Sequence, residues 1–116
     1  SNVLSADLLG LRTMWVPKAQ FRDGKWSFST PWGVKEFTGS QSGRHQLLLR
    51  PELVQVSDTG AKALVTKAFY TAGQRYINCS IGDLKNFTVL SDRDTGVGES
   101  VYLTADLDSI EVLNDA

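Results

Sequence analysis

The chain has 116 residues, 41% of them hydrophobic and 22% charged, and a formal net charge of −1. This length can bury a core, and the composition is that of one globular domain rather than a disordered segment. Because acidic and basic residues are mixed along the chain, no charged region would collect nucleic acid or an anionic membrane surface. No apolar run approaches the length of a bilayer span, and Ser1–Ser5 lacks the features of a secretion signal, so we expect a cytoplasmic domain without membrane insertion.

Strand signals dominate from the beginning of the chain. One short helix is predicted over Ser5–Gly10, with a serine N-cap and a terminal glycine. A tight hairpin is predicted at Phe21–Trp26, because its Asp-Gly pair readily adopts the positive φ angles of such turns. The return strand over residues 26–30 alternates in polarity, as a half-buried strand does. Thr30–Gly33 then turns the chain into a further strand over Val34–Phe37.

The second part of the chain begins after Gly39–Gly43, a polar and glycine-rich segment that we interpret as a linker. Seven strands are predicted beyond it, over residues 46–50, 54–56, 61–70, 74–81, 84–90, 100–105 and 110–113. Short strands at this spacing predict an all-β domain, a small OB-like or MOP-like barrel of antiparallel strands. Residues 1–38 would then be an N-terminal hairpin segment packed on or linked to the barrel, and residues 44–116 the barrel itself. A single cysteine, Cys79, excludes a disulfide within these residues and indicates a buried thiol on a strand.

The stretch Leu47-Leu48-Leu49-Arg50-Pro51-Glu52 contains the most distinctive local signal. Pro51 has no N–H to donate to a strand partner, and its ring favours an extended Arg50, so the leucine strand must stop or bend there. Arg50 and Glu52 flank this corner with opposite charges. They could pair locally, reach a neighbouring subunit, or remain a solvated corner, and exposed ion pairs contribute little to stability.

Three stretches together resemble the TOBE domain of ABC-importer ATPases: Leu47–Val56, Gly98–Leu103 and Ile110–Leu113. The resemblance covers roughly residues 44–114, and Thr30-Pro31-Trp32-Gly33 is similar to a turn that precedes the barrel in that family. The TOBE domain is a MOP-like regulatory barrel carried behind the nucleotide-binding domain in bacterial importers of iron, polyamines, sugars or related solutes. The likeness of the leucine stretch slightly favours the ferric-iron branch.

This resemblance implies a set of partners and a location. The parent protein would be an ATP-binding subunit that forms a homodimer, contacts ABC permease subunits and acts at the inner face of the plasma membrane. A small regulatory ligand could bind to the domain. ATP and magnesium would belong only to the nucleotide-binding domain, because these residues contain no Gly-x-x-x-x-Gly-Lys-[Ser/Thr] phosphate loop.

No catalytic, cofactor-binding or metal-binding residues are predicted. The acidic pairs Asp92/Asp94 and Asp106/Asp108 could hold a cation or act as acid and base, but turn chemistry explains them better, because aspartate supplies local hydrogen bonds at strand ends. His45, the only histidine, has no nucleophile near it in the sequence.

Aromatic residues gather in the first third of the chain, at Trp15, Phe21, Trp26, Phe28, Trp32 and Phe37. We interpret them as a core or a contact surface between subunits, so that Trp15, Trp26 and Trp32 join Arg50 and Glu52 as candidate interface or regulatory residues. The alternative is a single-strand nucleic-acid binder of the OB type, with bases stacked on these rings beside Lys18, Arg22 and Lys25.

A further alternative is a stand-alone module that binds a small anion such as molybdate. The candidate anion-binding loop is Thr95, Gly96, Val97 and Gly98, where backbone N–H groups could line a pocket.

Overall fold

The computed structural model describes residues 11–115, and the predicted helix at Ser5–Gly10 lies outside this range. The described chain is mostly antiparallel strand, with two single turns of 3₁₀ helix, η1 (Pro51–Leu53) and η2 (Leu107–Ser109). The prediction of an all-β domain with very little helix is therefore confirmed. Neither of these helical turns within residues 11–115 has the length that a membrane span requires.

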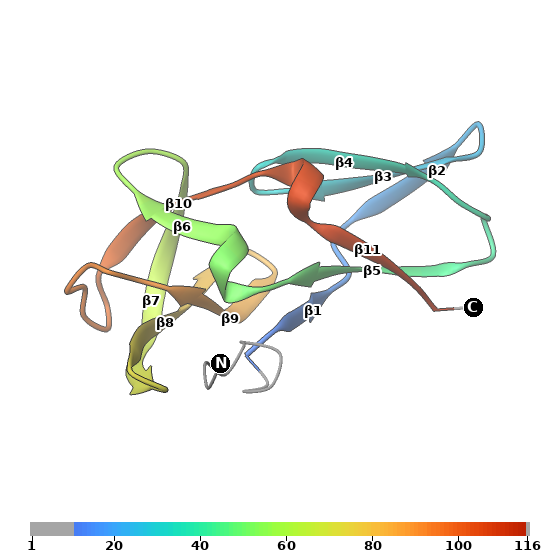
Figure 1. The fold of residues 1–116 in the computed structure, drawn as a ribbon. Coiled ribbons are helices and arrows are strands. Elements are labelled where there is room, and N and C mark those ends of the chain that lie inside the picture. The colour runs from blue at the N-terminus through green and yellow to red at the C-terminus, as the bar shows by residue number, and fades with distance from the viewer. Residues whose placement is uncertain (1–10, 116) are drawn as a thin grey trace.

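The strands form three antiparallel sheets, shown as a ribbon in Figure 1. The first sheet contains, in order, β2 (Ala19–Arg22), β3 (Lys25–Thr30) and β4 (Gly33–Thr38). The second contains β1 (Thr13–Trp15), β5 (Arg44–Leu49) and β11 (Glu111–Asp115). The third contains β6 (Val54–Ser57), β10 (Ser100–Ala105), β7 (Ala61–Thr71), β8 (Gln74–Ile81) and β9 (Leu84–Leu90).

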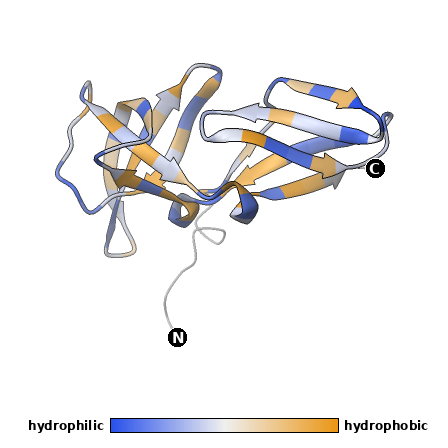
Figure 2. Cartoon of the chain, turned by 90° about the horizontal axis from the view of Figure 1, so that it is seen from above, coloured by the Kyte–Doolittle hydropathy of each residue, from blue (hydrophilic) through white to orange (hydrophobic). Residues whose placement is uncertain are grey.

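The first two sheets lie over one another, and the third lies beside them, which gives the molecule an elongated outline of 45 × 33 × 19 Å (Figures 1 and 2). Hydrophobic and hydrophilic residues alternate along several strands in Figure 2, as expected where one face of a sheet is buried. The largest fully buried side chains come from all three sheets and include Phe28, Leu47, Ile77, Phe87 and Leu103. One continuous core therefore joins the three sheets.

Two hairpin turns, at Asp23–Gly24 and Ala72–Gly73, have left-handed backbone geometry at both central residues. Asp23 and Gly24 have φ angles of 54° and 79°, and Ala72 and Gly73 have φ angles of 51° and 76°. Positive φ at both central residues matches the right-handed twist of the flanking strands. The hairpin predicted at Phe21–Trp26 is confirmed, and Ala72–Gly73 forms the turn between the strands predicted over residues 61–70 and 74–81.

The Arg-Pro-Glu corner lies where a two-stranded ribbon crosses from the second sheet to the third (Figure 1). On one side of the corner Leu48 of β5 pairs with Glu111 of β11, and on the other Val54 of β6 pairs with Ala105 of β10. Both strands of the ribbon are interrupted at this point, one by η1 and the other by η2. Pro51 occupies the first position of η1, where its missing N–H costs no hydrogen bond. The predicted break after the leucine strand is confirmed.

The third sheet curls but does not close into a barrel within the described residues. Its two edge strands, β6 and β9, approach each other without forming a hydrogen-bonded pair. The turn η1 lies against β9, so the chain just before β6 is helical and offers β9 no extended partner. The predicted small barrel is therefore an open, curled sheet.

Cys79 lies on β8, between β7 and the edge strand β9, with none of its surface exposed. Burial disfavours the charged thiolate and raises the pKa of the thiol from 9.0 to about 12. The buried strand thiol predicted from the sequence is confirmed by its position on β8.

We expect Cys79 to make the protein less stable as the pH rises above 9. The unfolded chain loses the thiol proton near its ordinary pKa of 9.0, whereas the folded chain keeps it until about pH 12. The free energy of unfolding should therefore fall by at most about 1.4 kcal/mol per pH unit in this window. Urea unfolding of wild type and Cys79→Ala across the window isolates this effect, because lysines and tyrosines titrate in both proteins. Parallel stability curves for the two proteins would contradict it.

Candidate functional site

The three tryptophans predicted as interface residues are all half-buried and occupy three different places. Trp15 lies on β1, Trp26 on β3 and Trp32 in the turn before β4, and each packs against the core. The indole Nε1 of Trp26 donates to Ser40 O at 3.0 Å, and that of Trp32 donates to Leu103 O at 3.0 Å. No ring contact joins the three indoles within residues 11–115, so they do not form one exposed aromatic face.

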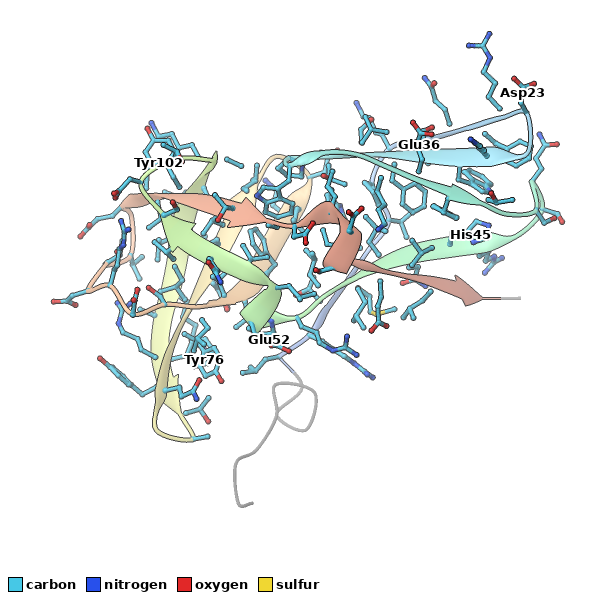
Figure 3. The ribbon with its side chains drawn as sticks, turned by 45° about the horizontal axis from the view of Figure 1, so that its top comes forward. Asp23, Glu36, His45, Glu52, Tyr76 and Tyr102 are labelled. Atoms are coloured by element: carbon cyan, nitrogen blue, oxygen red, sulfur yellow. The ribbon has the colours of Figure 1, made fainter. Side chains whose placement is uncertain are left out.

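Arg50 and Glu52 point to different partners at the corner. Arg50 Nη1 forms an ion pair with Glu111 Oε1 of β11 at 2.8 Å, which ties the corner to the neighbouring strand. Glu52, labelled in Figure 3, is exposed, and it lines a polar hollow of about 420 Å³ with Asp106 and Ser109. The structure thus joins Arg50 to a residue 61 positions away rather than to Glu52.

Three backbone donors of the candidate anion-binding loop, those of Thr95, Gly96 and Gly98, are used within the chain. Thr95 N donates to Arg93 O at 3.0 Å, Gly98 N to Val65 O at 2.9 Å, and Gly96 N to the Glu99 carboxylate at 3.3 Å. Arg75 holds the same loop, because its two terminal nitrogens donate to Arg93 O and Thr95 O at 2.5 Å. An anion bound here would have to displace the Glu99 carboxylate and these internal bonds.

The acidic pair at the corner has the structural role expected from turn chemistry. Asp106 caps η2, accepting from Asp108 N at 3.1 Å and from the Ser109 hydroxyl at 3.2 Å. Within residues 11–115, no group of three or more His, Cys, Asp or Glu side chains is placed to hold a metal ion.

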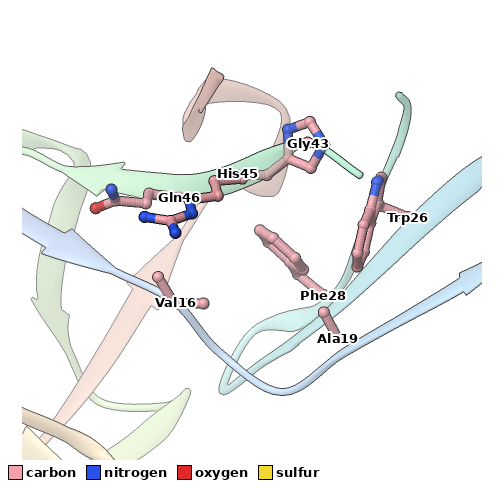
Figure 4. Close-up of a pocket in the computed structure, with 8 residues that line it drawn as sticks. Val16, Ala19, Trp26, Phe28, Gly43, His45 and Gln46 are labelled. Carbon is pink, nitrogen blue, oxygen red and sulfur yellow. The ribbon is translucent and has the colours of Figure 1, made fainter. Parts of the chain in front are cut away.

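A cleft of about 410 Å³ lies between the first and second sheets, and we take it as the candidate functional site (Figure 4). Its walls are formed by side chains from both sheets and from the segment between β1 and β2. They are Val16, Ala19, Trp26, Phe28, Gly43, Arg44, His45 and Gln46. This volume lies within the range of small-molecule sites, which are also mainly apolar with a few polar groups.

The wall around His45 is rigid. The centroid of its ring lies 5.3 Å from that of the Trp26 ring and 4.9 Å from that of the Phe37 ring, and both pairs have edge-to-face geometry. His45 Nε2 lies 3.4 Å from Ser40 O, which also accepts from Trp26. Figure 3 shows His45 on β5, below the strands of the first sheet. The only histidine is therefore enclosed by rings and backbone, a setting that suits packing better than proton transfer.

The segment Gly39–Gly43 contributes to this wall as a close turn. A Cβ at Gly39 would lie 3.2 Å from the His45 ring, and one at Gly43 would lie 2.9 Å from it. Gly43 N donates to Ser40 O at 3.1 Å, which closes the turn. The glycines that suggested a linker thus allow the backbone to wrap closely around His45.

The cleft has an open strand edge beside it. β1 ends at Trp15, opposite Leu47, so residues 44–46 of β5 have no strand partner on that side. In an antiparallel strand, alternate residues direct their N–H and C=O groups to each side. At least one of these three residues therefore presents backbone polar groups toward the side from which β1 has departed.

Sequence reasoning did not find the cleft. No local pattern in the sequence marks Val16, Ala19, Arg44 or Gln46 as members of one site. The aromatic concentration was the one available signal, because Trp26 and Phe28 form part of the wall. Comparison with protein-family models and with curated proteins produced no match for this chain.

Proposed function

We propose that this chain is a regulatory, accessory domain from the C-terminal end of an ABC-importer ATP-binding subunit. The observation that supports this most is the meeting of the three stretches that carry the resemblance. Leu47–Val56 is far in sequence from Gly98–Leu103 and Ile110–Leu113, yet the three stretches form the ribbon that bends at the corner, with Leu47 opposite Val112 and Val56 opposite Leu103. Residues that define one structural unit are expected to contact one another in that way.

In this role the domain would pair with a second ATPase subunit and adjoin the permease at the inner face of the plasma membrane. The solute we favour is ferric iron, on the likeness of the leucine stretch alone. Regulation requires a ligand or partner that binds one arrangement of the dimer better than another, because only differential affinity shifts an equilibrium. A change in one sheet could reach the other through the corner, since both strands of the ribbon cross it and the Arg50–Glu111 ion pair links them there.

We expect the isolated chain to bind ATP no better than background, with or without magnesium. The physical reason is that these residues contain no glycine-rich loop and lysine to hold the phosphates. Titration calorimetry with ATP and magnesium, together with a phosphate-release assay, measures both properties. Specific magnesium-dependent binding or turnover by the pure chain would refute the proposal that it is an accessory domain.

The attachment to an ATPase has its own test. Sequencing the gene upstream of the Ser1 codon should reveal a Gly-x-x-x-x-Gly-Lys-[Ser/Thr] motif in the same reading frame. If the reading frame encodes no phosphate loop there, the proposed attachment is wrong, whatever the calorimetry shows.

A further inference from the structure

We propose that the cleft between the first and second sheets binds a small organic anion, a monocarboxylate with an aromatic or branched apolar body. This inference goes beyond the proposed function and does not depend on it, because binding is a property of this chain's own residues. It rests on three features of the cleft: an apolar interior, a cation at the rim that pairs with no side chain among those the structure describes, and the open strand edge described above.

The interior suits a flat or branched apolar group. Phe28 lines the cleft and is 1% exposed. Its ring packs edge-to-face with that of Phe37, with 5.1 Å between the ring centroids, so it cannot easily turn away. The Trp26 indole is held by its hydrogen bond to Ser40 O. Figure 4 shows Val16 and Ala19 on the side of the cleft opposite β5, where Ala19 lies beside Phe28, its cross-strand partner on β3. Two fixed rings and two small aliphatic groups therefore offer apolar contacts at little cost in side-chain entropy.

The rim supplies one positive charge. Arg44 is exposed and lines the cleft, and its guanidinium makes no ion pair or hydrogen bond with a described side chain. No aspartate or glutamate is among the residues that line the cleft within the described part of the chain. A guanidinium beside an apolar surface recognises a carboxylate well, because two parallel N–H bonds fit its two oxygens.

The other donors also suit a carboxylate. Gln46 carries an amide beside Arg44, and the unpaired edge of β5 at residues 44–46 adds a backbone donor. With a single cation, the cleft matches a monoanion better than a phosphate dianion, which usually requires several positive or backbone donors. An apolar body with one carboxylate therefore fits both the interior and the rim.

Phenylacetate is a suitable probe, since it joins a phenyl ring to a carboxylate. Two matched compounds separate the contributions: phenylacetamide keeps the ring without the charge, and acetate keeps the charge without the ring. Amide and indole signals in ¹H–¹⁵N NMR spectra report binding at Trp26, Gly43 and Ala19 directly. We expect saturable shifts with phenylacetate and a dissociation constant on the order of 1 mM, as is usual for a ligand of this size. Phenylacetamide and acetate should each bind at least about tenfold more weakly.

Two pairs of variants test the location, and the NMR spectrum of each first establishes that it is folded. Arg44→Gln should weaken phenylacetate binding about tenfold, whereas Arg22→Gln, an exposed arginine outside the cleft, should not. Ala19→Phe should fill the cleft and abolish the shifts, whereas Gln20→Phe on the next exposed position should leave them unchanged.

Several results would overturn the inference. One is the absence of saturable shifts at the cleft residues, and another is equal affinity for phenylacetate and phenylacetamide together with no effect of Arg44→Gln. Binding of acetate as tight as that of phenylacetate would mean that the apolar interior contributes nothing. None of these results bears on the ATPase attachment, which the gene sequence decides separately.

Discussion

Replacement of Gly60 by alanine is expected to lower the free energy of unfolding by at least about 3 kcal/mol. Gly60 has a φ of +123°, a region that essentially only glycine adopts. An added Cβ would also lie 2.2 Å from Leu103 O, a backbone atom of β10. β10 inserts between β6 and β7, and Gly60 stands just before β7, so neither chain can move aside without breaking the pairing of Leu103 with Ala61.

Gly73→Ala is the matched control, because Gly73 also has a positive φ, of 76°, but nothing lies within 4 Å of its added Cβ. Gly73→Ala should lower the free energy of unfolding by only about 1 kcal/mol, the cost of placing alanine in this backbone conformation. Urea unfolding of both variants, followed by circular dichroism, gives the comparison. Equal losses in the two proteins would show that the contact with β10 is not the cause.

Phe87→Ala is expected to lower the free energy of unfolding by about 3–5 kcal/mol, because it leaves a cavity where the third sheet packs against the first. Phe87 on β9 is fully buried, and its ring lies 6.4 Å from that of Trp32 with an interplanar angle of 87°. Trp32 in turn donates to Leu103 O of β10. Loss of the Phe87 ring therefore removes apolar contacts and also frees an indole that links the first sheet to the third.

The same unfolding experiment on Phe87→Leu provides the control, since leucine keeps most of the buried volume and should retain most of the stability. Near-ultraviolet circular dichroism reports the surroundings of the tryptophans, and its signal should decrease in the alanine variant before unfolding begins. If Phe87→Ala lowered the free energy of unfolding by less than about 1 kcal/mol, the prediction would be wrong, because the surrounding side chains would then fill the cavity.

Much of the strand layout could be predicted because its determinants are local. Asp23 and Gly24 specify a tight turn through their own φ preferences, and Gly73 does the same at the second central position of its turn. Pro51 ends a strand because of its own ring and missing N–H. Each of these effects acts within a few residues. The positions of the turns and strand ends, and with them the all-β class, can therefore be predicted from the local sequence.

Pairing between distant segments could not be predicted in the same way. Nothing in Ser100–Ala105 indicates that β10 inserts between β6 and β7, or that η1 keeps β6 and β9 from closing a barrel. Arg50 likewise selects Glu111 although Glu52 is much nearer in sequence. These outcomes depend on which arrangement buries the most apolar surface across all three sheets, a comparison that involves the whole chain.

The sequence by itself determined an all-β domain, its turns, a buried thiol and the absence of a phosphate loop from these residues. Only the tertiary structure decided that Trp26, Phe28 and His45 line a cleft whose rim carries Arg44, because β1 ends early and leaves part of β5 without a partner. The length of a strand can be estimated from its own residues. The space left where a neighbouring strand stops depends on both strands and on the sheet packed above them.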